Sequence, residues 1–271
     1  MTTITGTGTY SGASVYGQNN SRQTGTTSGS TAGTSTAGAG TTGAGNTSST
    51  ATSKSVADAI AAAANSASYD FTTVAQNART VLNAGISAYG QTPGSQTTDQ
   101  QWVKIFGGMD RRSLYAVASN QGGQFSPQEQ TAAKTLMDDQ LSSAGNNVSS
   151  SDSTSQQIAG YTAQVNLLNN ASPEEKKSAS WAYSMADAQT AARMADIDSR
   201  MPQSSSSSPL LSTLMGAMYN VRSQVSGSVS FGTVNSLSDI TSQPWAQSYA
   251  SQIESAFAAS YQPGGSYSVS V

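Results

Sequence analysis

The first 53 residues constrain the fold most, because they contain very few side chains that could form a hydrophobic core. Between Met1 and Ser53 the sequence cycles through threonine, serine, glycine and alanine, and it carries one charged residue, Arg22. Burial of so few apolar groups cannot offset the conformational entropy that a backbone loses when it becomes ordered. We therefore expect residues 1–53 to be a disordered low-complexity tail, with the fold beginning after it.

The composition of the whole chain limits its partners. Of the 271 residues, 36% are hydrophobic and 10% are charged, against about 45–50% and about 25% in ordinary globular domains. The 12 basic residues are scattered along a chain of net charge −3, so we expect no nucleic-acid binding, which requires clustered positive charge. No apolar run approaches the length of a bilayer-crossing helix, so we also expect no membrane span.

The sequence contains neither histidine nor cysteine. This composition excludes disulfides, thiolate nucleophiles, imidazole general bases and zinc sites of the usual Cys/His type. Any catalysis by side chains of this chain would have to use carboxylates, or a serine activated by a lysine.

After residue 53 the pattern becomes that of helices. Residues 54–70 are rich in alanine, and residues 71–89 repeat apolar side chains with a period near 3.6. Asp99 begins a further expected helix, which Gly107 and Gly108 end. Asp110 can then start the next helix by accepting hydrogen bonds from the backbone N–H groups of its first turn.

The clearest local signal is a helix start at Ser126. Serine at the N-cap, Pro127 at the first helical position and Glu129 as the partner in a capping box each favour a helix here. The sequence from Ser172 to Glu175 repeats this chemistry and predicts a helix that runs to about Arg200. The residues beyond the two caps differ, so helix capping explains the repeat better than internal duplication does.

These patterns predict a mostly α-helical protein, made of one or more small helical bundles that follow the tail. We expect a helical domain over residues 54–203, centred on 99–141, with a polar connector at 142–157. Residues 209–271 are expected to form a C-terminal helical segment that packs on this domain or forms a small subdomain. Within that segment, 227–239 could be either a strand or a loop.

The loop around Gly123 resembles a degenerate EF-hand, with Asn120, Gln124 and Glu129 as candidate calcium ligands. Aligning Gly123 with the EF-hand glycine places Glu129 at the final bidentate position. Ala118 occupies the first ligand position, where the motif requires a carboxylate. A single carboxylate leaves a divalent cation under-neutralised, so a capped helical hairpin without metal is the favoured interpretation. We accordingly expect no cofactor, with calcium as the alternative.

Paired carboxylates are the remaining route to catalysis, since glycoside hydrolysis needs two acids and no histidine. Three acidic clusters could supply such a pair: Asp138 with Asp139, Glu174 with Glu175, and Asp196 with Asp198. Helix-start charge and solvated helix faces are the simpler interpretation of these acids. Arg111 and Arg112 could likewise contact an acidic partner or mark a helix start.

The tail, the scarcity of charge and the absence of histidine and cysteine resemble bacterial surface or exported proteins, including substrates of flagellar or related export machines. The N-terminus lacks the basic and apolar regions of a signal peptide. We therefore expect a non-enzymatic structural or interaction protein, extracellular or at the cell surface and otherwise cytoplasmic, that binds a protein partner in an oligomeric state the sequence does not define. The alternatives are a calcium-responsive helix-loop-helix module and a carboxylate-pair hydrolase.

Overall fold

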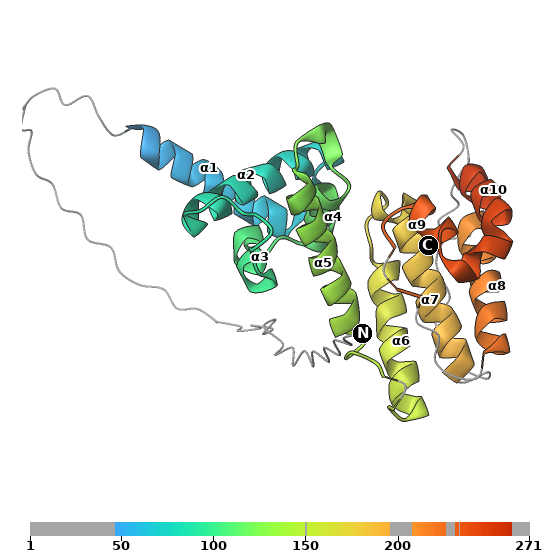
Figure 1. Cartoon of the computed structure of the whole chain (residues 1–271). Coiled ribbons are helices and arrows are strands. Elements are labelled where there is room, and N and C mark those ends of the chain that lie inside the picture. The colour runs from blue at the N-terminus through green and yellow to red at the C-terminus, as the bar shows by residue number, and fades with distance from the viewer. Residues whose placement is uncertain (1–46, 150, 196–207, 226–230, 233, 262–271) are drawn as a thin grey trace, which may run out of the picture. The chain divides into compact units, whose positions relative to one another are not determined.

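The computed structural model describes residues 47–149, 151–195, 208–225, 231–232 and 234–261. These residues form ten α-helices and four short 3₁₀ helices, and no strand occurs among them (Figure 1). The prediction of a mostly α-helical protein is confirmed. Residues 1–46, which make up most of the expected tail, lie outside the described residues.

The N-terminal half of the described chain contains five α-helices and two 3₁₀ helices. In order these are α1 (Thr47–Ala64), η1 (Ser66–Ser68), α2 (Phe71–Tyr89), α3 (Asp99–Phe106), α4 (Arg111–Ala118), η2 (Gln121–Gly123) and α5 (Pro127–Ala144). Helix α1 begins at Thr47 and not near Lys54, so the last residues assigned to the tail are helical. Extending an existing alanine-rich helix backwards requires no new nucleus, which is the costly step in helix formation.

The predicted helix boundaries in this half are confirmed by their capping bonds. Asp110 accepts a 2.8 Å hydrogen bond from the backbone N–H of Ser113 at the start of α4. Gly107 ends α3 in the left-handed conformation, with φ 60°. Ser126 and Glu129 form the predicted reciprocal capping box at the start of α5.

Helices α1 to α5 share one hydrophobic core, which we call the N-terminal cluster. Its larger buried members are Val74, Val81, Leu82, Trp102, Ile105, Phe106, Met109, Leu114, Val117, Phe125, Leu136 and Met137. Helices α2 and α3 approach so closely that a Cβ atom added to Gly85 would lie 2.1 Å from the carbonyl oxygen of Ile105. Only glycine allows this backbone contact.

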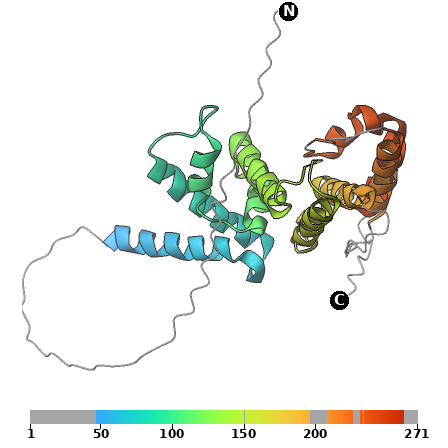
Figure 2. The same ribbon diagram turned by 90° about the horizontal axis from the view of Figure 1, so that it is seen from below.

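The C-terminal half contains α6 (Thr154–Asn169), η3 (Glu175–Lys177), α7 (Ala179–Ala195), α8 (Pro209–Gln224), α9 (Leu237–Thr241), η4 (Pro244–Tyr249) and α10 (Ala250–Ser260). Helices α6, α7 and α8 lie side by side, with α7 in contact with both of its neighbours (Figure 1). Helix α10 packs against α8, as Figure 2 also shows.

These C-terminal helices enclose a second hydrophobic core, the C-terminal cluster. Its larger buried members are Val165, Leu168, Trp181, Tyr183, Met185, Leu210, Leu211, Leu214, Met218, Phe231, Val234, Ile240 and Ile253. The division between the two cores therefore falls between α5 and α6. Helices α8, α9 and α10 share their core with α6 and α7.

One predicted helix start was wrong. The helix expected to begin at Ser172 begins instead at Ala179, as α7, after the 3₁₀ turn η3. The extended backbone of Ser178, with φ −90° and ψ 151°, separates the two elements. Its hydroxyl accepts a 3.1 Å hydrogen bond from the backbone N–H of Trp181 and so caps α7. Helix α7 is described as far as Ala195, and residues 196–200 lie outside the described residues.

Within the described ranges, no helix is long and apolar enough to cross a lipid bilayer.

Candidate functional site

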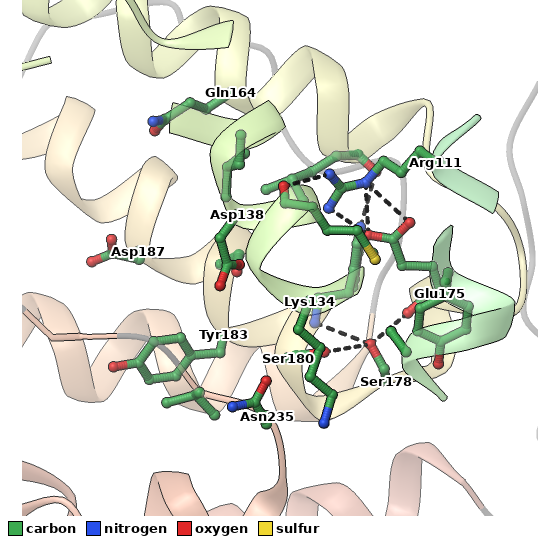
Figure 3. Close-up of a pocket in the computed structure, with 18 of the residues that line it drawn as sticks. Arg111, Lys134, Asp138, Gln164, Glu175, Ser178, Ser180, Tyr183, Asp187 and Asn235 are labelled. Carbon is green, nitrogen blue, oxygen red and sulfur yellow. Dashed lines mark hydrogen bonds and ion pairs between the residues drawn. The ribbon is translucent and has the colours of Figure 1, made fainter. Parts of the chain in front are cut away.

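A cavity of about 330 Å³ lies among α4, α5, α6, α7 and the segment around Val234 (Figure 3). Apolar side chains of both hydrophobic clusters, among them Met137 and Trp181, form part of its wall. Its charged lining residues are Arg111, Lys134, Asp138, Glu175 and Asp187. What the cavity can do depends on which of these charges already have partners.

Arg111 and Glu175 form a buried ion pair at one side of the cavity. Arg111 donates from Nη2 and Nε to Oε1 of Glu175 at 2.7 and 3.0 Å, and from Nη1 to the carbonyl oxygen of Met137 at 2.9 Å. Glu175 is only 2% exposed. Burial raises the pKa of Glu175, and the adjacent guanidinium opposes this rise. The Glu175 carboxylate is therefore engaged in holding α4 and α5 to η3.

Arg112 and Glu174 form a second, parallel ion pair beside the first. Arg112 donates from Nη2 and Nε to the two carboxylate oxygens of Glu174, at 2.7 and 3.1 Å. Its Nη1 donates to the carbonyl oxygens of Ser66 and Tyr69, each at 2.8 Å. The hydrogen bond from Arg112 lowers the pKa of Glu174 against the opposing effect of partial burial. Two consecutive arginines are thus matched to two consecutive glutamates.

Asp187 is the third acid on the cavity lining, and it is paired with Arg222. The distance from Arg222 Nη2 to Asp187 Oδ1 is 2.6 Å, and Arg222 Nη1 donates to Thr190 Oγ1 at 2.6 Å. The guanidinium also lies 4.7 Å from the centre of the Phe231 ring. Although the Asp187 side chain is 41% exposed, its charge is neutralised within the protein.

Asp138, on α5, differs from the other acids of the cavity. It forms no hydrogen bond or ion pair with any other residue in the described part of the chain, and no dashed line reaches it in Figure 3. Desolvation raises its pKa to about 6, with the neighbouring charge of Arg111 acting in the opposite direction. Lys134, one turn earlier on α5, also lines the cavity without a hydrogen-bonding or ion-pair partner among the described residues.

The three candidate calcium ligands have other contacts. Asn120 accepts a 2.9 Å hydrogen bond from the backbone N–H of Phe125, and Gln124 donates from its side chain to the carbonyl oxygen of Gln121 at 3.4 Å. Both carboxylate oxygens of Glu129 accept hydrogen bonds from Arg79, at 2.7 and 2.9 Å.

The carboxylate that would bind a calcium ion, that of Glu129, is therefore already bound by the Arg79 side chain. Arg79 also donates to the carbonyl oxygen of Gln124, at 3.3 Å. Burial acts to raise the pKa of Glu129, but the hydrogen bonds from Arg79 and Ser126 outweigh it and the pKa is lowered. Calcium binding in this loop would require Arg79 to be displaced.

The acidic clusters named from the sequence are distributed differently in space. Asp138 and Glu175 line the same cavity, whereas Asp139 and Glu174 are absent from its lining. Asp196 and Asp198 lie outside the described residues. Across the described ranges, no three acidic side chains come together in a group that could hold a metal ion.

Sequence reasoning found the arginine doublet and the glutamate doublet but did not match them to each other. It also gave no indication that Asp187 and Arg222 would meet, or that Lys134 and Asp138 would line a cavity. The spacing of Lys134 and Asp138 along α5 is a signal that they share a helix face. Comparison of the chain with protein-family models, with curated proteins and with solved structures finds no match.

Proposed function

We propose that this chain is an exported or cell-surface bacterial protein that acts by binding a protein partner and not by catalysis. The observation that supports this most directly is that four of its acids are paired with arginines. Glu129, Glu174, Glu175 and Asp187 each face an arginine at 2.6–2.7 Å. Acids paired in this way connect helices. They do not supply the two carboxylates with different pKa values that hydrolysis needs.

The composition of the N-terminal residues supports the proposal of export. Residues 1–53 contain one charge and almost no large apolar side chains, a composition that does not favour independent folding. The compact helical unit begins at Thr47. We propose that these N-terminal residues direct the chain to a flagellar-type or related export route.

Fractionation of the native bacterium tests this proposal. We expect the full chain in the culture supernatant or on the cell surface, and we expect deletion of residues 2–46 to leave it in the cytoplasm with its helical circular dichroism unchanged. Deletion of residues 262–271 serves as the control for chain shortening. A full-length protein found only in the cytoplasm would contradict export, and export of the chain lacking residues 2–46 would contradict the role of that segment.

A carboxylate-pair hydrolase is the second candidate, because Asp138 and Glu175 line one cavity and burial raises the pKa of both. In such an enzyme Asp138 would be the general acid and Glu175 the general base. The hydrogen bonds from Arg111 to both carboxylate oxygens of Glu175 argue against it. A panel of nitrophenyl glycosides decides the matter, because hydrolysis that is lost in Asp138→Asn and in Glu175→Gln would replace our first proposal.

A further inference from the structure

We propose that the cavity beside α5 is a binding site for a small zwitterion, a molecule of about amino-acid size that carries one ammonium group and one carboxylate. Asp138 would bind the ammonium group and Lys134 the carboxylate (Figure 3). This inference does not depend on export or on a protein partner.

The first step of the argument is the pairing of charges around the cavity. Arg111 is neutralised by Glu175 and Asp187 by Arg222, through contacts of 2.7 and 2.6 Å. Among the charged residues that line the cavity, Asp138 and Lys134 remain without an ion-pair partner in the described part of the chain. One negative and one positive group are therefore available to a ligand.

The second step is that these two groups form no ion pair with each other, although the charge of Lys134 acts on Asp138 from a greater distance. They are four residues apart on α5, where facing side chains have Cβ atoms about 5–6 Å apart. The order, with lysine preceding the acid, is the less favourable one for an ion pair within a helix. A molecule with both charges satisfies both groups, whereas a simple amine would be repelled by Lys134 and a simple acid by Asp138.

The third step concerns the rest of the lining and the size of the cavity. Gln164 on α6 and Asn235 bring amide groups to the wall, and neither side chain has a hydrogen-bond partner in the described residues. The cavity volume of about 330 Å³ is at the lower end of the range of about 300–1,000 Å³ found for small-molecule sites. This size suits a free amino acid better than a peptide or an oligosaccharide.

Calorimetric titration of the full chain tests the proposal with four probes that differ in charge. Two are zwitterions, L-norvaline and 4-aminobutyrate, and two carry a single charge, 1-butylamine and butyrate. We expect at least one zwitterion to bind saturably below about 10 mM, at least tenfold more tightly than either singly charged probe. Failure of both zwitterions to bind, or equal binding by 1-butylamine or butyrate, would overturn the proposal.

Matched variants locate the site. Asp138→Asn and Lys134→Gln should each weaken zwitterion binding by about tenfold or more, whereas Asp139→Asn on the same helix and Lys104→Gln on α3 should not change it. Ser184 also lines the cavity. Ser184→Leu would put a larger side chain into it while leaving both charges in place, and should abolish binding. Binding that survives Ser184→Leu, or that is lost equally in Asp139→Asn, would contradict this location.

Discussion

Arg111 donates two hydrogen bonds to a single carboxylate oxygen of Glu175, which lies 64 residues further along the chain. The pair connects helices of the N-terminal cluster to the turn that precedes α7 in the C-terminal cluster. Its carboxylate is almost completely buried. Substitutions in this pair therefore test how strongly the stability of one core depends on the other.

Loss of Arg111 should destabilise the fold strongly, because it leaves Glu175 buried without a counter-charge. We expect Arg111→Met to lower the free energy of unfolding by about 3–5 kcal/mol, the usual result of removing one partner from a buried ion pair. Urea denaturation measures the change. The double variant with Glu175→Gln should recover part of the loss, and a double variant as unstable as Arg111→Met would contradict the pairing.

The neighbouring pair provides the comparison, since it has similar geometry and more exposure. The side chain of Glu174 is 26% exposed, against 3% for Glu175. Glu174→Gln should therefore cost about 1 kcal/mol or less, as partly solvated ion pairs do. The single variant Glu175→Gln should cost more than Glu174→Gln. Equal losses of stability in these two variants would show that burial does not distinguish the two pairs.

Close packing of α2 on α3 predicts opposite effects for the same substitution at two helical glycines. Gly85→Ala places a Cβ atom against the Ile105 carbonyl and should cost about 1–3 kcal/mol, as overpacking does. Gly216 on α8 has open space around the same position, so Gly216→Ala should stabilise the fold by about 0.5–1 kcal/mol through helix propensity. Thermal unfolding measures the change in Tm, which should fall in Gly85→Ala and rise in Gly216→Ala. A rise in Tm for Gly85→Ala would show that α3 can move away from α2 without a loss of stability.

Asp138 should lower the free energy of unfolding at neutral pH, because its pKa is higher in the folded protein than in the unfolded chain. The group ionises near its ordinary value of 3.8 in the unfolded chain and at about 6 in the fold. As the pH rises between these values, the unfolded state loses the proton first, so the folded state becomes relatively less stable. The cost is absent below the lower value and complete above the higher one.

Replacement of Asp138 by asparagine should remove this cost. Because the side chain is partly exposed, we expect a gain of about 1 kcal/mol at neutral pH, a rise in Tm of about 2–4 °C, and a gain that disappears toward pH 4. Differential scanning calorimetry at several pH values measures it, with Asp58→Asn on the exposed face of α1 as control. An equal gain at all pH values would exclude ionisation of Asp138 as the cause.

Calcium should have no effect on stability, because Arg79 already holds both oxygens of Glu129. We expect Tm to stay within about 1 °C when calcium is added to about 5 mM, well above the dissociation constants of EF-hand sensor sites. A saturable rise in Tm that Glu129→Gln removes would restore the calcium-responsive interpretation.

Local signals in the sequence predicted the local structure well. The boundaries of α2 and α3 and the start of α5 follow from apolar periodicity together with caps such as Ser126 and Gly107. Each of these features depends on residues within one or two helical turns of one another, so the physical cause is visible in a short stretch of sequence.

Contacts between distant residues could not be predicted in the same way. Glu174 and Glu175 follow a serine and a proline, as a helix start would, and their local chemistry gives no sign of Arg111 and Arg112. Those pairings depend on how α4 approaches η3, which is set by the packing of both cores. The helix start at Ala179 has a local cause instead, because the Ser178 hydroxyl donates to the carbonyl oxygen of Glu175 and accepts from the backbone N–H of Trp181.

The separation of the two hydrophobic clusters along the chain has a mechanical consequence. Each core is built from one continuous stretch of sequence, from Ala59 to Met137 and from Val165 to Ile253. Tension applied at the N-terminus can therefore unravel the first core while the second stays intact, so the work of extraction is divided into two smaller steps. If the export route that we propose requires an unfolded chain, the two cores can unfold one after the other and not together.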